Sequence, residues 1–276
     1  MAAVGRDNLR RVHPIPNTGF ARAYLIEGED GLMAVDVGSP GCARDIVDYI
    51  RGVLRGTPED LRYITATHFH IDHIGGTAHL LGMCAPSTRV LFYSLVKDYL
   101  RGERRISLIR NWFVGFPPAT FVSARYVRRF SHLGAESLAG IPLPGLRRII
   151  KLPFDTNRIE YFGGKMQDVC SLGDFGFREW KVLRTPGHTE DSVCFFNETT
   201  SELLSGDLIV NISKDGRGEV NRFCWRRDRI QKSYHFLLRT ISPTVIYPGH
   251  GEVMVGGSDI LSRVKTFARG AAGHNR

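Results

Sequence analysis

Residues 67–73 of this chain read Thr-His-Phe-His-Ile-Asp-His, so three histidines and one aspartate fall within six consecutive positions. Burying so many polar side chains without partners would cost several kcal/mol. Imidazole nitrogens and carboxylate oxygens are common ligands of zinc and related divalent metals. The segment therefore predicts a metal-binding loop.

The residues just before this loop, 61–67, are rich in β-branched and aromatic side chains, which is typical of a strand. If the chain stays extended beyond them, His68 and His70 lie on the same side, because alternate side chains of a strand share a face. Asp72 and His73 follow, just before a pair of glycines that permit a close turn. We expect the loop to hold two metal ions while supplying only half of their ligands.

Three later segments end in the same kind of side chain. Each is a short apolar run, typical of a strand, and each is followed by histidine or aspartate next to glycine or proline. The side chains at these ends are His188, Asp207 and His250. We expect them to complete the metal site.

The order and spacing of these residues resemble the metallo-β-lactamase-fold hydrolase superfamily, over roughly residues 20–267 apart from a middle stretch. The resemblance implies an α/β fold, a four-layer αββα sandwich of two mixed sheets, with a two-metal site at one edge. It also implies the ligands of the first metal (His68, His70 and His188), those of the second (Asp72, His73 and His250), and a bridging carboxylate (Asp207).

The ligand set is similar to that of glyoxalase II-type thioesterases, lactonases and phosphodiesterases. The main β-lactamase group has a cysteine where this chain has Asp207, which argues against that group. Flavin-linked di-iron reductases have a glutamate where this chain has His70, which disfavours an oxygen-reducing role. Zinc is the expected metal, because histidine and carboxylate sites with open positions suit it. Iron or manganese fits the same ligands.

Asp36 is the last residue of a predicted hairpin made of residues 23–26 and 32–36. A loop or helix-cap role is the simpler interpretation of this aspartate. The resemblance instead places Asp36 beneath the metal site, where a carboxylate fixes the orientation of a ligand without binding metal itself.

Two divalent metal ions bridged by a carboxylate would share a water, whose pKa falls to about 7 on metal binding. We therefore predict an enzyme, a dinuclear metal-dependent hydrolase whose metal-bridging hydroxide attacks an ester, thioester or lactone. Asp72 would orient the nucleophile or shuttle its proton. Two alternatives stay open: a phosphodiesterase or nuclease, and a metal-retaining binding protein with weak catalysis.

Residues 97–168 differ from the rest of the chain. They contain thirteen Lys or Arg against six Asp or Glu, a net charge of +7 out of +9 for the whole chain. Aromatic residues are interleaved with the basic ones, and prolines divide the stretch into short pieces. We predict a largely helical basic insertion within a single domain spanning residues 1–276. It could be a solvated face, a lid over the site that selects an anionic or apolar-tailed substrate, or a surface for nucleic acid, which we favour less.

Apolar residues at helical spacing predict the remaining helices. These cover residues 43–54, 74–81, 226–241 and 260–267, and the tail 270–276, with its solvent-exposed His274, is expected to fray.

The apolar runs, the N-terminal residues and the cysteines indicate in which cellular compartment the protein is expected. No apolar run is long enough to cross a bilayer, and the N-terminus lacks the apolar core of a secretory signal. The five cysteines form no C-x-x-C pair, which fits a reducing compartment. We expect a cytoplasmic protein that acts on a small-molecule substrate, and the sequence leaves its oligomeric state open.

Overall fold

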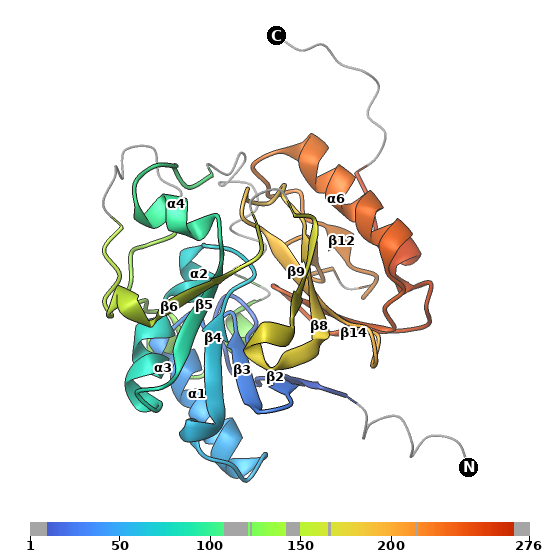
Figure 1. Ribbon diagram of the computed structural model, residues 1–276. Helices are drawn as coiled ribbons and strands as arrows, with labels where there is room; N and C mark the ends of the chain where they lie inside the picture. The colour runs from blue at the N-terminus through green and yellow to red at the C-terminus, as the bar shows by residue number, and fades with distance from the viewer. Residues whose placement is uncertain are drawn as a thin grey trace, which may run out of the picture.

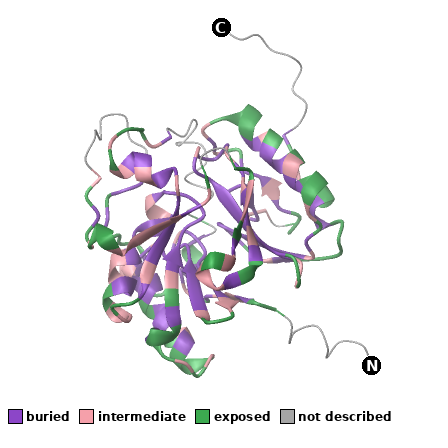
Figure 2. Cartoon of the chain, in the orientation of Figure 1, coloured by how far each residue is buried: buried purple, intermediate pink, exposed green. Residues whose placement is uncertain are grey.

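Two six-stranded sheets pack against each other at the centre of the molecule (Figure 1). The computed structural model describes residues 10–107, 121, 123–141, 150–164, 167–213 and 215–267. Buried residues concentrate in the strands and on the helix faces turned toward them (Figure 2). This arrangement confirms the predicted sandwich of two mixed sheets.

The first sheet contains the N-terminal strands. Its order is β1 (Val12–Pro14), β2 (Tyr24–Gly28), β3 (Gly31–Val35), β4 (Leu61–Thr65), β5 (Arg89–Tyr93) and β6 (Ile159–Phe162). β1, β2 and β3 are antiparallel, which confirms the predicted hairpin, whereas β3 to β6 run parallel. The connections between the parallel strands include α1 (Pro40–Gly52), α2 (Ile71–Ile74) and α3 (Thr77–Met83).

The second sheet contains the C-terminal strands. Its order is β14 (Met254–Val255), β13 (Val245–Pro248), β10 (Glu202–Gly206), β9 (Val193–Asn197), β8 (Phe177–Arg184) and β7 (Val169–Leu172). Helix α6 (Arg227–Thr240) buries Ile230, Tyr234 and Leu237 in the smaller of two hydrophobic clusters. A separate pair, β11 (Ile209–Val210) and β12 (Glu219–Val220), lies beyond Asp207.

Like-directed strands bring the predicted ligands to one edge of the sandwich. In the first sheet β3 and β4 are parallel, so Asp36 and the loop that starts at Thr67 leave the same edge. In the second sheet β10 and β13 are parallel, and β8 runs the same way because β9 is antiparallel to both β8 and β10. The residues that follow these strands therefore meet.

Helix α1 begins three residues before its predicted start. The hydroxyl of Ser39 accepts a hydrogen bond from the backbone N–H of Cys42 at 3.1 Å, and Pro40 is the first helical residue. Both are favoured ways to start a helix. Ile46 and Ile50 then face the core and are fully buried.

The predicted helix over residues 260–267 is wrong in extent, since only one 3-10 turn forms, η7 (Ile260–Arg263). The backbone N–H of Lys265 donates instead to the carbonyl of Gly218, and the carbonyl of Lys265 accepts from Val220. These bonds to the β12 region replace helical ones. The apolar residues that suggested a helix are nevertheless buried.

The largely helical insertion is not confirmed in the part of the chain that the structure describes. There, the regular elements between residues 97 and 168 include most of α4 (Val96–Leu100), the 3-10 turns η3 (Ala124–Tyr126), η4 (Phe130–His132) and η5 (Thr156–Arg158), and the core strand β6, and residues 121 and 123 are also helical. Its backbone groups bond to the body of the protein instead, as when the N–H of Glu136 donates to the carbonyl of Gly75 at 2.7 Å. Residues 108–120 and 142–149, like the tail with His274, lie outside the described residues.

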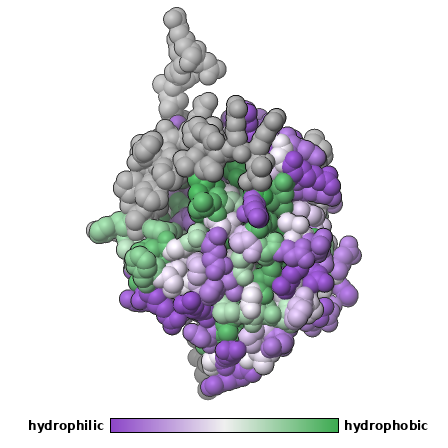
Figure 3. All heavy atoms as spheres, turned by 90° about the vertical axis from the view of Figure 1, so that its left-hand side faces the viewer, coloured by the Kyte–Doolittle hydropathy of each residue, from purple (hydrophilic) through white to green (hydrophobic). Residues whose placement is uncertain are grey.

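Residues 123–141 form a strap across the loops of the first sheet. Its own Tyr126 and His132 are buried, and the imidazole of His132 lies 2.6 Å from the carboxylate of Asp45 on α1. Phe130 is 89% exposed and Leu138 is 68% exposed, so the strap has no apolar core of its own. Hydrophobic and hydrophilic side chains alternate over the side of the molecule that carries α3 and α4 (Figure 3).

Within the described residues, no helix combines the length and the apolar character needed to cross a membrane.

Candidate metal centre

The loop after β4 carries the first histidines. The strand ends at Thr65, so the expectation that the extended strand continues through His68 and His70 is wrong. The two imidazoles nevertheless converge, because His68 presents Nε2 and His70 presents Nδ1, 2.9 Å apart. Asp72 and His73 follow in the single turn of α2.

His188 joins this pair from the end of β8. Its Nε2 lies 3.1 Å from Nδ1 of His70, so three imidazole nitrogens face one point. Two facing imidazole nitrogens can form a hydrogen bond with each other only if one of them carries a proton. Three nitrogens that share one point suit a cation better than a set of mutual hydrogen bonds.

A second group lies beside the first. Nε2 of His250 is 3.4 Å from Oδ2 of Asp72, and Nε2 of His73 is 3.8 Å from the same oxygen. These three residues are close enough to hold one ion. Asp72 is the least buried of the three, with 30% of its side chain exposed, so this group faces the surface of the protein.

Asp207 lies between the two groups. Its Oδ2 is 3.2 Å from Nε2 of His188 and 3.4 Å from Nε2 of His250, and its Oδ1 is 3.6 Å from Nε2 of His73. One carboxylate thus reaches side chains of both groups. We call the seven residues the His/Asp cluster: His68, His70, Asp72, His73, His188, Asp207 and His250.

Four of the five imidazoles have their outer nitrogen next to an oxygen. Nδ1 of His188 lies 2.6 Å from the carbonyl of Phe223, and Nδ1 of His250 lies 2.9 Å from that of Phe20. A carbonyl only accepts, so Nδ1 carries the proton and the Nε2 lone pair faces the cluster. Nδ1 of His68 is likewise 3.1 Å from the hydroxyl of Thr67.

Asp36 supports the fourth imidazole from beneath the cluster. Its Oδ2 is 3.0 Å from Nδ1 of His73, and its Oδ1 accepts the backbone N–H of Thr67 at 2.7 Å. Asp36 has a φ of 62°, in the left-handed region that non-glycine residues rarely adopt. The position matches a carboxylate that orients a ligand and fixes its tautomer.

Two buried polar atoms of the cluster without hydrogen-bond partners in the described part of the chain indicate that it can hold a metal ion. Nε2 of His73 and Oδ1 of Asp207 are buried and have no hydrogen-bond partner among the described residues. Buried polar atoms without partners are rare in native proteins and call for an ion or water. Nitrogen and carboxylate donors fit divalent metal ions, and the residues present can hold them.

Burial and neighbouring charges within the cluster shift the pKa values of His70 and His73 in opposite directions. Burial, together with the neighbouring His188, lowers the pKa of His70 to about 3. Burial would also lower the pKa of His73, but the carboxylates of Asp36, Asp72 and Asp207 raise it to about 9. A metal ion would replace the proton held by His73.

We expect the metal-free protein to lose stability as the pH rises from about 6.5 to 9. In this range His73 still holds a proton in the folded chain, whereas an unfolded histidine, with an ordinary pKa of 6.5, has lost it. Stability falls with pH wherever the folded state binds more protons. Urea unfolding at several pH values, with a chelator present, measures this slope.

The zinc-loaded protein should show the opposite slope, because metal binding requires deprotonated histidines and grows stronger as the pH rises. Rising stability of the metal-free protein across the same window would contradict the assigned charges.

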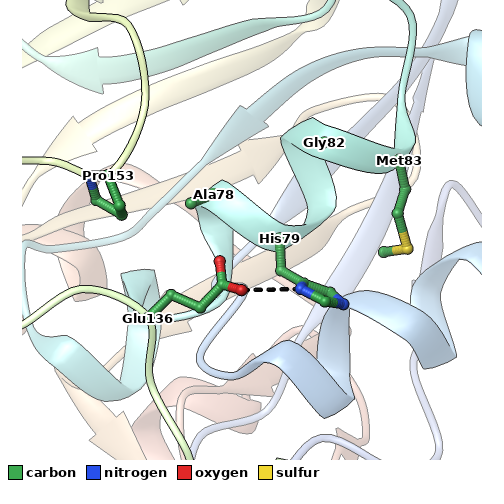
Figure 4. A pocket seen from close by; sticks show the side chains of 6 residues that line it. All are labelled: Ala78, His79, Gly82, Met83, Glu136 and Pro153. Atoms are coloured by element: carbon green, nitrogen blue, oxygen red, sulfur yellow. Dashed lines mark hydrogen bonds and ion pairs between the residues drawn. The ribbon is translucent and has the colours of Figure 1, made fainter.

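A pocket on the outer side of α3 is separate from the His/Asp cluster (Figure 4). It is lined by Ala78, His79, Gly82, Met83, Glu136 and Pro153. His79 has partners on both sides, since its Nδ1 lies 2.8 Å from Glu136 and its Nε2 accepts from Arg44 at 3.2 Å. No residue of the His/Asp cluster lines this pocket.

The sequence did not reveal several residues that hold the cluster in place. Phe20 and Phe223 act through backbone carbonyls, which no side-chain pattern reports. Asp191 accepts the backbone N–H of Phe69 at 2.7 Å. A signal for Asp191 was available, since it is an aspartate in the turn directly after His188, between two predicted strands.

Comparisons with known proteins agree with the fold. The family model of the metallo-beta-lactamase superfamily matches residues 16–86. Among solved structures, that of TTHA1623 in a di-iron-bound form has a TM-score of 0.55 at 19% identity, covering 92% of this chain and 98% of that one. The archaeal protein ST1585 from Sulfolobus tokodaii has the same TM-score and identity, covering 92% of this chain and 84% of its own.

Two curated relatives cover most of this chain. The probable metallo-hydrolase YqjP of Bacillus subtilis (strain 168) is 25% identical over 262 residues, which are 89% of this chain and 71% of that protein. The acyl-coenzyme A thioesterase MBLAC2 of Gallus gallus is 27% identical over 198 residues, which are 69% of this chain and 58% of that protein. The chain thus spans little more than half the length of the second relative.

Proposed function

We propose that this chain is a dinuclear metal-dependent hydrolase of an ester, thioester or lactone, because it resembles the metallo-β-lactamase superfamily in its fold and in its His/Asp cluster. The observation that carries the proposal is the bridging position of Asp207, within 3.4 Å of histidines from both groups. Two three-residue groups joined by one carboxylate are what a pair of neighbouring ions requires.

Within this proposal each part of the His/Asp cluster has a role. His68, His70 and His188 hold the first ion, and the other histidines hold the second with Asp72. Bound divalent ions supply Lewis acidity, which polarises a carbonyl and lowers the pKa of water to about 7. Zinc is the metal we propose, and iron or manganese would suit the same donors.

Asp72 is the residue that we assign to proton handling. Its Oδ2 faces Nε2 of His250, and its side chain is 30% exposed, so the carboxylate also reaches the open side of the cluster. Burial would raise the pKa of Asp72, but His73 and His250 lower it below its ordinary value. The carboxylate is therefore ionised at neutral pH, the state in which it can orient a water and accept its proton.

Four described arginines of the insertion favour a small substrate over nucleic acid. Arg104 pairs with Glu190, Arg125 lies 3.0 Å from Glu252, and Arg129 lies 3.5 Å from Asp45. The guanidinium of Arg158 donates to two backbone carbonyls. Guanidinium groups committed to the protein itself do not form the free row of cations that phosphate backbones require.

The acyl-coenzyme A thioesterase among the relatives also supports a carbonyl substrate. A phosphodiesterase remains the second candidate, carried by the net charge of +7 over residues 97–168.

A hydrolysis panel tests the proposal. The zinc-loaded protein would be given one thioester, one lactone, one β-lactam and one aryl phosphodiester. We expect turnover of the thioester or the lactone that a chelator abolishes and added zinc restores. Turnover confined to the phosphodiester would replace the proposal with the second candidate, and metal binding without any turnover would favour a binding protein.

A further inference from the structure

Asp191 is a buried carboxylate that joins three segments of the chain. It lies in the turn between β8 and β9 and is 1% exposed. Its Oδ2 accepts the backbone N–H of Phe69 at 2.7 Å, and its Oδ1 accepts the hydroxyl of Tyr99, on α4, at 3.2 Å. Phe69 is the residue between His68 and His70.

A second hydrogen bond holds the residue on the other side of His68. The backbone N–H of Val193 donates to the carbonyl of Thr67 at 2.9 Å. His68 thus lies between two residues, Thr67 and Phe69, that are both hydrogen-bonded to the segment following His188. These ties fix the distance between the loop and the end of β8, which sets how far apart the imidazoles lie.

The turn that carries Asp191 is itself well held. The hydroxyl of Ser192 accepts the backbone N–H of Thr189 at 3.0 Å, and the carbonyl of Thr189 accepts from Gly187 at 2.8 Å. The backbone N–H of Glu190 donates to the hydroxyl of Ser107 at 3.0 Å. A rigid turn lets one carboxylate act as a fixed point for the loop.

Aromatic packing holds the side chain of Phe69 in place. The side chain of Phe69 is 1% exposed, with its ring centroid 5.6 Å from that of Phe92 and 6.1 Å from that of Tyr99. Tyr99 therefore contacts Asp191 through its hydroxyl and packs against Phe69 through its ring. The side chain and the amide of Phe69 are held together, so its two histidine neighbours have little freedom.

We infer that Asp191 is a positioning residue for the first metal position, which it sets by holding the Phe69 amide so that His68, His70 and His188 converge. It does not bind metal itself, since both its oxygens face other donors. The inference rests on the proposed metal centre. Residues outside the ligand set that orient ligands contribute about 10-fold to 100-fold in metal affinity.

The test compares Asp191→Ala and Asp191→Asn with a matched control, Glu202→Ala. The asparagine keeps an oxygen for the Phe69 amide and an NH2 group for the Tyr99 hydroxyl. Glu202 is also 1% exposed and accepts three hydrogen bonds, from Arg11, Thr200 and Tyr247. It begins β10, whereas Asp207 follows the far end of that strand, so the control removes a buried carboxylate away from the cluster.

The readouts are zinc affinity, from competition with a chromophoric chelator, and the visible spectrum of the cobalt-loaded protein. We expect Asp191→Ala to bind zinc about 10-fold to 100-fold more weakly, with an altered cobalt spectrum. Asp191→Asn should retain most of the affinity. Glu202→Ala should unfold at a lower urea concentration but bind zinc as the natural protein does.

Unchanged zinc affinity in Asp191→Ala would overturn the inference, and so would an equal loss in Glu202→Ala. If Asp191→Ala does not fold, Tyr99→Phe tests the same tie from the donor side, and an affinity equal to that of the natural protein would overturn the inference. A natural protein that binds no zinc would overturn the inference and the proposed function together. One that binds zinc but hydrolyses nothing would fail only the proposed function.

Discussion

Replacing Asp207 with alanine should reduce hydrolysis by roughly a thousand-fold or more, the size of effect seen when one member of a cooperating catalytic set is removed. The reason is its position, since it is the carboxylate that lies within 3.4 Å of both His188 and His250. Without it, the two proposed ions would lose their common ligand. Elemental analysis should find fewer than two metal ions per chain, and circular dichroism should show that the chain still folds.

The matched control for this variant is Asp228→Ala. Asp228 is an exposed carboxylate in the first turn of α6, paired with Arg226 at 2.9 Å. An exposed pair of this kind contributes at most about 1 kcal/mol to stability, so activity and metal content should be unchanged. Two metal ions per chain in Asp207→Ala would contradict the bridging role.

Replacing Gly249 with alanine should also remove activity, although the new side chain is only a methyl group. An added Cβ would lie 2.1 Å from Oδ1 of Asp207 and 3.0 Å from the backbone carbon of Gly206. The carboxylate must then rotate away from the cluster or the two strands must separate. We expect zinc affinity to fall by about 10-fold to 100-fold and the free energy of unfolding to fall by about 1–3 kcal/mol.

Gly82→Ala is the control for the glycine substitution. Gly82 lies on α3, and an added Cβ there meets no atom within 4 Å. Alanine in an open helical position should stabilise the protein by up to about 1 kcal/mol and leave zinc binding unchanged. Isothermal titration and urea unfolding of both variants separate a local clash from a general effect of losing glycine. Full zinc affinity in Gly249→Ala would show that Asp207 does not need its observed position.

The sequence was informative about the cluster for a physical reason. Residues that follow the carboxyl ends of like-directed strands meet at one edge, and the strand ends could be recognised from short apolar runs. That is why His188, Asp207 and His250 were expected to join the loop that begins at His68. The structure brings all seven residues together, and it places Asp36 beside His73.

The pattern of residues could not predict how each imidazole is turned. Strand periodicity suggested only that His68 and His70 lie on the same side, whereas the strand ends at Thr65 and the two imidazoles present different nitrogens. The choice depends on outer contacts, such as the carbonyl of Phe223, which are long-range backbone features.

The strap and the C-terminal turn were both predicted to be helical, and these predictions failed for a related reason. Helical spacing of apolar residues reports which side chains are buried, but it does not report where the backbone hydrogen bonds go. Around Lys265 those bonds go to the β12 region, and at Glu136 they go to the loop after α2. Tertiary contacts therefore decided between helix and turn.

The central claim is that the His/Asp cluster holds two metal ions at once. Anomalous X-ray scattering from crystals of the zinc-loaded protein, measured at the zinc edge, tests it most directly. We predict two peaks about 3.5–4 Å apart, one among His68, His70 and His188 and one near Asp72, with Asp207 between them. A single peak, or peaks away from the His/Asp cluster, would contradict the account.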